Sequence, residues 1–265
     1  MYKKGLAVLV LAAANVLAMA HEFWLEPDKF YFNAGETAHV HFRIGADFIG
    51  DPWKAEPDRF QRFEHHAGNR AFDLRSLIKE GSGDPLEVRL ASEGTHLLVM
   101  ETKRAFIKMG GADFTEYLRE EGLDNIYYDR EKNKLSADSA TELYSRYSKL
   151  ILQAGTRGDE TYKKVCNLPI EIIPDSNPLD MKKGDAIRFK ILYQGKPLFG
   201  AKVKVWNRYN HRTTVQNIYS QQDGFIETHV SNPGTWMVSV VNMVPSRDPD
   251  ARYRSFWGTL VFGVR

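Results

Sequence analysis

The stretch TAHVHFRI (37–44) alternates strictly between two kinds of side chain: its even positions are apolar and its odd positions are polar. Apolar side chains at every second residue lie on one face of an extended chain, so the stretch predicts a strand with one buried face. His39 and His41 fall on the other face, about 7 Å apart at two strand rises. The next residues, GADFIGDPW (45–53), are rich in turn formers and predict a loop.

Most of the remaining sequence is also strand-like. In the first half, strands are predicted at RFQRFEHHAG (59–68), NRAFDL (69–74), PLEVRLA (85–91) and THLLVMETK (95–103). Seven more strands follow at regular spacing up to residue 265, which is the usual number for an immunoglobulin-like sandwich. We therefore expect a mainly β protein with two β-sandwich domains, 21–167 and 168–265, of which the second is immunoglobulin-like.

A helical insertion is expected at the end of the first domain, over residues 112–150. The segment ADFTEYLREEGLDN (112–125) has the composition of a helix, and Gly122 is its stop signal. The polar segment DREKNKLSADSA (129–140) is expected to be a loop. ATELYSRYSKLILQAG (140–155) is expected to begin as a helix, because Leu143, Tyr144 and Tyr147 form an apolar stripe at helical spacing. It is expected to become a strand near its end.

The first twenty residues have the three parts of a secretory signal peptide. Two lysines form a charged start, an apolar stretch covers residues 6–17, and small residues at Ala18 and Ala20 suit cleavage. The apolar part is short for a membrane span, and no second stretch approaches that length. We therefore expect a periplasmic or secreted protein with no membrane span after cleavage, and His21 as its first mature residue.

Charge is divided unevenly between the two halves of the chain. Residues 21–150 hold 18 basic and 24 acidic residues, whereas residues 151–265 hold 16 and 10. The opposite signs predict that the two halves attract each other. The mature chain as a whole is nearly neutral, so it has no general attraction to nucleic acid.

The sequence lacks the common enzyme signatures. The GxxxxGK[ST] phosphate loop, GxGxxG after a strand, HExxH and GxSxG are all missing. The single cysteine, Cys166, lies among apolar residues, which predicts a buried, inert thiol. We therefore expect a protein that is not an enzyme.

The histidines are the residues that point to chemistry. An N-terminal His21 would offer its α-amine and its own Nδ1 to one metal ion, and one further imidazole would complete a T-shaped site of three nitrogens. Such coordination suits Cu(II) or Ni(II). His39 or His41 is the candidate for that imidazole. Alternatively, both belong to a solvated strand face, and His21 is only the residue at which cleavage leaves the chain.

The other five histidines have less specific roles. His65 and His66 are sequence neighbours, which point to opposite faces of a strand. His96 lies inside an apolar strand and is expected to be a hydrogen-bonded core residue. His211 and His229 are expected at the surface.

Several segments together resemble a family of exported bacterial proteins of unknown function, often labelled as a nickel-uptake or nickel-transport periplasmic component. They include HEFWLEP (21–27), FTEYLREEGL (114–123), YQGKPLFGAKVKVW (193–206), DGFIETHVSNPGTW (223–236) and RYRSFWGTLVF (252–262). The resemblance implies an exported, two-domain, β-rich protein with a link to transition metals. It also implies that His21, which opens the first segment, anchors a metal site.

Three functions follow as hypotheses. The first is a periplasmic protein that binds Ni(II), Co(II) or Cu(II) through His21, His39 and His41 and passes the ion to a transporter or an outer-membrane receptor. The second is a non-catalytic β-sandwich module for binding or adhesion, without metal. The third is a copper-dependent oxidative enzyme with a histidine brace.

Overall fold

A computed structural model describes residues 21–81 and 83–265, so the predicted signal peptide lies outside the described residues. The first half of the described chain contains β1 (Glu22–Pro27), β2 (Tyr31–Phe32), β3 (Thr37–Ala46), β4 (Ile49–Pro52), β5 (Phe60–Ala67), β6 (Arg70–Asp73), β7 (Leu86–Arg89), β8 (Gly94–Thr102), β9 (Ala105–Met109), α1 (Gly111–Glu120), α2 (Asp124–Lys132) and β10 (Ala140–Ala154). The second half contains β11 (Ile170–Pro174), β12 (Ala186–Tyr193), β13 (Lys196–Pro197), β14 (Lys202–Tyr209), β15 (Arg212–Tyr219), β16 (Phe225–His229), β17 (Gly234–Pro245) and β18 (Tyr253–Val264).

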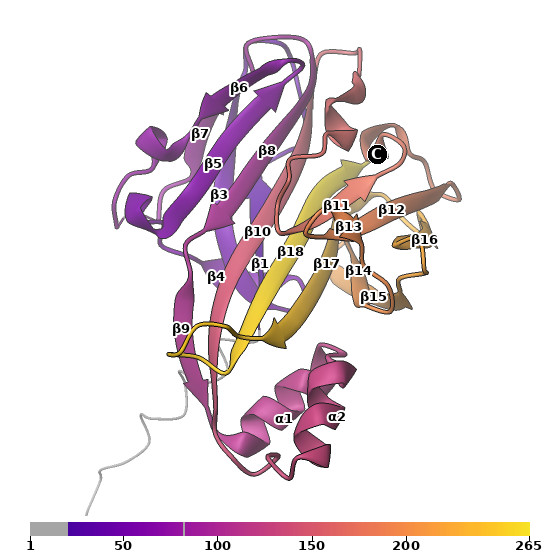
Figure 1. The fold of residues 1–265 in the computed structure, drawn as a ribbon. Helices are drawn as coiled ribbons and strands as arrows, with labels where there is room; N and C mark the ends of the chain where they lie inside the picture. Colours follow the sequence, from indigo (N-terminus) through magenta and orange to yellow (C-terminus); the bar gives the residue numbers. More distant parts are fainter. Residues whose placement is uncertain (1–20, 82) are drawn as a thin grey trace, which may run out of the picture.

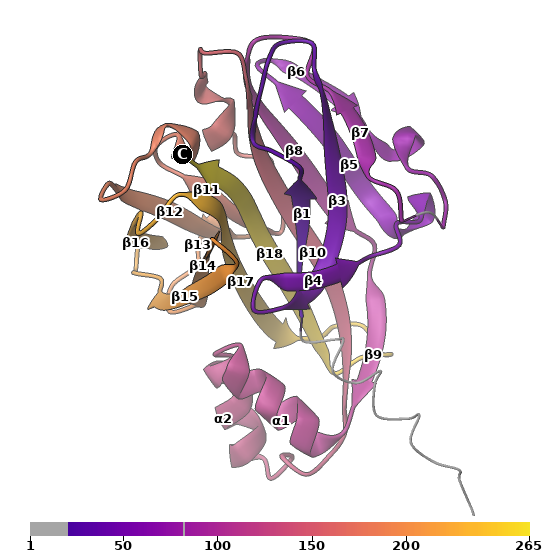
Figure 2. The same cartoon turned by 180° about the vertical axis from the view of Figure 1, so that it is seen from behind.

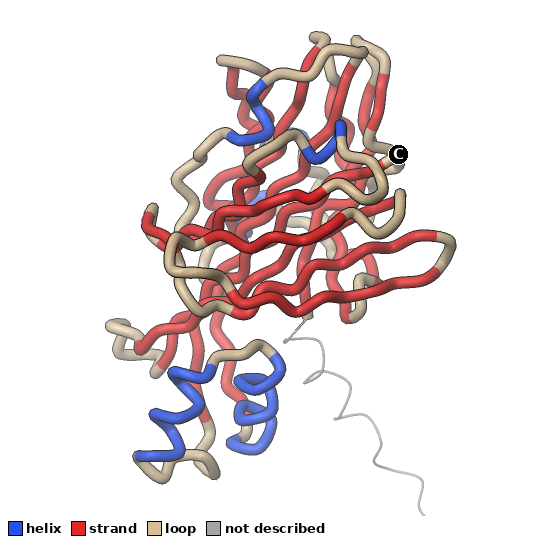
Figure 3. Tube along the Cα trace, turned by 90° about the vertical axis from the view of Figure 1, so that its right-hand side faces the viewer, coloured by secondary structure: helices blue, strands red, loops and turns tan. Residues whose placement is uncertain are grey.

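The protein is mainly β, as the sequence predicts, and its sheets pack in three layers (Figures 1 and 2). The central sheet has ten strands, in the order β15-β14-β17-β18-β10-β8-β5-β6, with β2 and β9 also paired to β10. A four-stranded sheet of β1, β3, β4 and β7 covers one of its faces. A second four-stranded sheet of β11, β12, β13 and β16 covers the other, and the two helices lie together below the strands (Figure 3).

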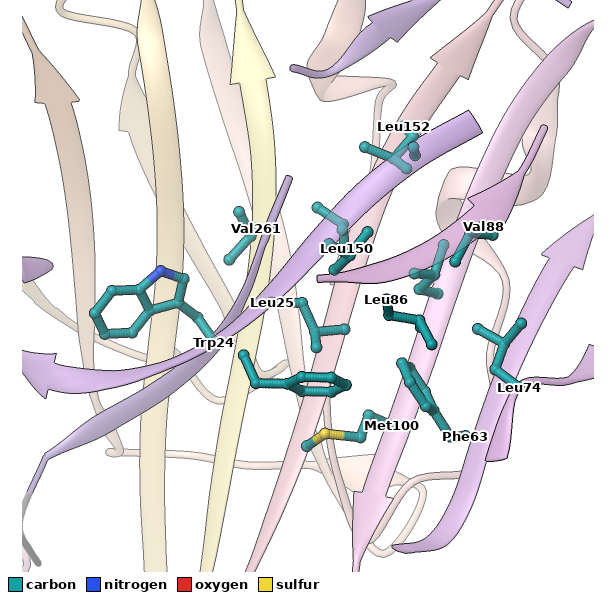
Figure 4. Packing of buried hydrophobic residues seen from close by; sticks show 14 of the residues in the cluster. Trp24, Leu25, Phe63, Leu74, Leu86, Val88, Met100, Leu150, Leu152 and Val261 are labelled. Atoms are coloured by element: carbon teal, nitrogen blue, oxygen red, sulfur yellow. The ribbon is translucent and has the colours of Figure 1, made fainter. Parts of the chain in front are cut away.

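Alternation along the central strands builds two hydrophobic cores. Leu98 and Met100 on β8 face the β1–β3 sheet, whereas their neighbours Leu97 and Val99 face the β11–β12 sheet. Figure 4 shows the first core, in which side chains from both layers meet: Trp24, Leu25, Phe63, Leu74, Leu86, Val88, Met100, Leu150, Leu152 and Val261. The middle strands β8, β10 and β18 are therefore largely buried on both faces, whereas the edge strands β6 and β15 of the same sheet are exposed.

The central sheet joins the two halves of the chain. β10 from the first half and β18 from the second pair in parallel, from Glu142↔Tyr253 to Leu150↔Val261. Between the described parts of the two halves there is thus a continuous ladder of backbone hydrogen bonds. The predicted boundary between residues 167 and 168 falls just before β11. The immunoglobulin-like character of the second half stays a prediction.

Two expectations for the helical insertion are wrong. The segment from Ala140 to Ala154 is a strand throughout. It is paired and largely buried on both faces, so its sequence lacks the alternation of apolar and polar residues by which a strand with one exposed face is recognised. The segment expected as a loop from 129 contains the end of α2. Arg130, which is 1% exposed, orders it by donating to the carbonyl oxygens of Leu135 (2.5 Å) and Asp138 (2.7 Å).

The loop expected over residues 45–53 is a hairpin instead. β3 and β4 are joined by Asp47 and Phe48, which both have positive φ (54° and 57°), as a two-residue type I′ turn requires. The second position of such a turn is usually glycine, but here it is Phe48, so the sequence does not reveal the turn. The Phe48 ring is fully buried and lies 5.2 Å from the Trp24 ring, and this contact holds the turn in place.

Among the described residues, no helix has the length and apolar character needed to cross a membrane.

Candidate metal site

Two of the three predicted metal ligands share one carboxylate. His39 and His41 lie on the same face of β3, and Asp28 follows the end of β1. Nδ1 of His39 lies 3.6 Å from Oδ2 of Asp28, and Nε2 of His41 lies 3.1 Å from Oδ1. The Asp28 backbone N–H donates to the His39 carbonyl (3.2 Å), which holds the backbone of Asp28 beside β3.

Further carboxylates surround this group, which we call the Asp28 cluster (Asp28, His39 and His41). The antiparallel register places Glu87 of β7 directly opposite His39, and Glu26 of β1 directly opposite His41. Side chains that are directly opposite in antiparallel strands lie within about 5 Å at Cβ. Glu26 is already engaged, because it accepts hydrogen bonds from Arg43 and Arg208.

A pocket of about 330 Å³ opens beside His41. Its lining is mainly polar and includes the charged side chains of Asp28, Arg43 and Arg208. The side chains of the Asp28 cluster are 56% (Asp28), 44% (His39) and 28% (His41) exposed. They can therefore change rotamer without disturbing a core, and an ion bound there would remain within reach of a second protein.

His21, the third predicted ligand, lies at the opposite end of β1. His41 pairs with Glu26, which is five residues further along the strand, or about 17 Å at one strand rise per residue. The fold therefore does not bring His21 to His39 or His41, and these residues cannot together hold one ion in this arrangement. The chelate of His21 would need other donors.

Buried charges lie directly beside His21. Lys204 of β14 donates to Glu22 (3.0 Å) and to Glu121 (2.8 Å), and all three residues are less than 10% exposed. Burial is the main reason that the pKa of Glu121 rises to about 7, and the neighbouring Glu22 raises it further. Glu22, which follows His21 in the chain, is thus already held by Lys204.

The end of α1 delivers Glu121 to this group. Gly122 has φ +67°, and its N–H and that of Leu123 donate to the carbonyl oxygens of Arg119 and Leu118, which is a Schellman motif. A Cβ on Gly122 would come within 2.7 Å of the Lys202 side chain, whose Nζ donates to the Glu120 carbonyl. Two lysines of β14 therefore stabilise the negative end of α1.

Three of the remaining histidines, His65, His66 and His96, are buried elsewhere in the fold. His65 Nε2 and His96 Nδ1 are 2.7 Å apart, and His96 Nε2 lies 3.0 Å from the Ser92 carbonyl oxygen, so His96 is a hydrogen-bonded core residue, as predicted. Burial lowers the pKa of His65 to about 4. His66 contacts Glu64 (2.8 Å). His211 and His229 are exposed, as predicted.

Cys166 is buried, as the sequence predicts, and burial raises the pKa of its thiol. Its sulfur lies 3.6 Å from the Lys164 carbonyl oxygen. The thiol is therefore a packed, protonated group, whereas a metal would bind the thiolate.

Across residues 21–81 and 83–265, no group of three or more His, Cys, Asp or Glu side chains is arranged so that it could enclose a metal ion. The Asp28 cluster offers two imidazoles and one carboxylate, a set of N and O donors that suits Cu(II), Ni(II) or Zn(II), but it would have to close around the ion. The sequence pattern missed Asp28 and Glu87, because their position beside the histidines depends on the β1–β3–β7 register.

A family model described as "Domain of unknown function (DUF4198)" matches residues 18–244. The chain belongs to this family. The assignment confirms the resemblance to a family of unknown function, and the nickel label is not part of the description. A search of curated proteins finds no match.

Two solved structures show a low similarity to the chain. The three N-terminal domains of the bacteriophage RB49 Highly Immunogenic Outer Capsid protein (Hoc) are 9% identical, and the match covers 92% of this chain and 71% of that one. A mutant of Salmonella alpha-2-macroglobulin is 10% identical, and the match covers 96% of this chain but 16% of that one. Both TM-scores are 0.21, so neither similarity bears on fold or function.

Proposed function

We propose that the protein is a periplasmic or secreted binding protein for a transition-metal ion, Ni(II), Co(II) or Cu(II), and that it passes the ion to a transporter or an outer-membrane receptor. The observation that supports the proposal is the convergence of His39 and His41 on Asp28. Two imidazoles and a carboxylate on one open strand face form a donor set that can both take up and release a borderline ion.

His21 keeps the role of a second, terminal chelate. Its α-amine and Nδ1 would bind an ion at the other end of β1, beside Glu22 and Glu121. These two carboxylates share one lysine, so the group carries an excess negative charge when Glu121, whose pKa is about 7, is ionised, and that charge favours a cation. The two donor groups lie too far apart for a single ion, so the proposal predicts two separable sites.

The test is metal binding by the mature protein, measured by titration calorimetry with Ni(II) and with Cu(II). Three chains are compared: one that begins at His21, one with a single glycine before His21, and a His39→Ala/His41→Ala double variant. The extra glycine should abolish the terminal chelate only, and the double variant should abolish the Asp28 site only. A His211→Ala/His229→Ala variant, which removes two exposed histidines, is the matched control and should bind like the parent.

Equal, weak binding by all four proteins would overturn the metal proposal. The second candidate, a non-catalytic binding or adhesion module, would then take its place. It is favoured by the absence, within the described chain, of side chains arranged to enclose an ion. A copper-dependent oxidative enzyme is the weakest hypothesis, because neither His39 nor His41 lies beside His21 to complete a brace.

A further inference from the structure

A groove of about 1350 Å³ runs between the central sheet and the β12–β13 turn, away from the proposed metal sites. Its walls are the β8–β9 turn, the segment before β11, the β12–β13 turn and the loop from β17 to β18. Arg254, near the start of β18, lies on its floor. Gly263, which lines the pocket beside His41, is nine residues further along β18, or about 30 Å away. The groove is therefore a separate site.

Arg254 lacks an acceptor for one of its nitrogens. Nη2 donates to the Ser145 hydroxyl (3.4 Å), and the guanidinium also interacts with the Tyr147 hydroxyl, but Nη1 has no acceptor at hydrogen-bond distance among the described residues. Glu101 also lines the groove; burial raises the pKa of its carboxyl, and the charges of Arg62 and Arg254 oppose that rise from a distance. A guanidinium donor that is buried without an acceptor costs free energy, and a carboxylate is the acceptor whose two oxygens match its planar fork.

One aromatic ring lies beside the guanidinium, and two others adjoin that ring. Its Cζ lies 4.9 Å from the centroid of the Phe256 ring, which meets Tyr193 edge-on at 5.1 Å and Tyr147 at 6.2 Å. All four residues line the groove. The Tyr193 side chain is half-buried, so its ring can contact a bound molecule. A ligand that satisfies Arg254 would thus rest on aromatic surface.

The charge of the groove favours an anion. Its lining includes four basic residues, Lys103, Arg104, Arg247 and Arg254, against two acidic ones. One of the acids, Asp248, is already close to Arg104 (3.7 Å), and this pair connects the two rim loops. The volume exceeds the range usual for small-molecule sites, about 300–1,000 Å³, so a small organic molecule would occupy only part of the groove.

We propose that this groove binds a small organic carboxylate with a flat apolar body. The carboxylate pairs with Arg254, and the body rests against Phe256 and Tyr193. The inference is independent of the metal function, because it uses no metal ligand.

The test uses 3-phenylpropionate as a probe and 3-phenylpropanamide, which has the same shape without the charge, as its control. Binding to the mature protein is measured by titration calorimetry with a chelator present, so that metal plays no part. The carboxylate should bind about tenfold more tightly than the amide, since a charge-assisted pair is worth roughly twice a neutral hydrogen bond. Arg254→Gln should reduce the affinity for the carboxylate to that for the amide.

Arg188→Gln is the matched control. Arg188 also stacks on a phenylalanine ring (4.1 Å from the Phe225 centroid), but it lies on the outer sheet and does not line the groove. This variant should bind the carboxylate like the parent protein. Equal binding of acid and amide by the parent protein would overturn the proposal without any variant. Unchanged carboxylate binding by a folded Arg254→Gln protein would overturn it as well.

Discussion

Glu22 and Lys204 lie 182 positions apart in the sequence and form a buried ion pair, with 3.0 Å between Oε1 and Nζ. Two residues further along both strands, Trp24 and Trp206 belong to the same core, and two residues further again Arg208 donates to Glu26. The acidic first half and the basic second half are therefore joined through β1 and β14.

Removing the cation from this group should destabilise the fold strongly. Lys204→Met leaves Glu22 and Glu121 buried without their shared partner, and we expect a loss of about 3–5 kcal/mol in the free energy of unfolding, measured with urea. The triple variant Glu22→Gln/Glu121→Gln/Lys204→Met should recover most of it. Lys202→Met, on the same strand but more exposed, should cost less than about 1 kcal/mol. Similar losses for both lysines would contradict the argument.

The sequence predicts the strands well and their partners poorly. Alternation at 37–44 and the spacing of turn residues locate most strands, because each depends on local pattern. β10 is missed since it is buried on both faces, and pairing partners such as β18 are over a hundred residues away. The same limit applies to the candidate site: His39 and His41 could be recognised from one strand, but Asp28 could not, because its position is set by the β1–β3 register.

Stability should fall as the pH rises from about 4.5 to about 7, and Glu142 is one cause. Burial raises its pKa to about 7, against the smaller opposite effect of hydrogen bonds from Ser255 and Tyr117. In this window the folded carboxyl keeps a proton that the unfolded chain releases, so unfolding becomes more favourable as pH increases. Glu142→Gln should raise the free energy of unfolding at pH 8 by about 1–3 kcal/mol and flatten the pH dependence.

The control for this prediction is Glu116→Gln on the exposed face of α1, which should leave the pH dependence of urea unfolding unchanged. If Glu142→Gln has the same pH dependence as the parent protein, the buried carboxyl is not the titrating group. Glu121, whose pKa is also about 7, would then be the first residue to replace.

Asp28 provides a sharper test of the proposed metal site than the histidines do. Asp28→Asn keeps the shape of the side chain and removes its charge, so the affinity of the site for Ni(II) should fall about tenfold if the carboxylate is a ligand. The titration uses the chain with an extra glycine before His21, so that the terminal chelate is blocked. Asp51→Asn, an exposed acid of β4 in the same sheet, should bind like its parent. Unaltered binding by Asp28→Asn would mean that Asp28 only orients the imidazoles.

In the β3–β4 turn, a glycine should stabilise the protein at position 47 and destabilise it at position 48. Asp47 is exposed and has φ 54°, a region in which a Cβ is strained, so Asp47→Gly should raise the free energy of unfolding by about 0.5–1 kcal/mol. Phe48→Gly relieves the same backbone strain but removes a fully buried ring from its contact with Trp24. We expect it to cost about 3–5 kcal/mol, because a large buried side chain is lost. Urea unfolding of both variants shows which effect is larger at Phe48, backbone strain or side-chain packing. If both variants stabilise the protein, backbone strain at the turn outweighs the packing of Phe48, and the ring does not hold the hairpin in place.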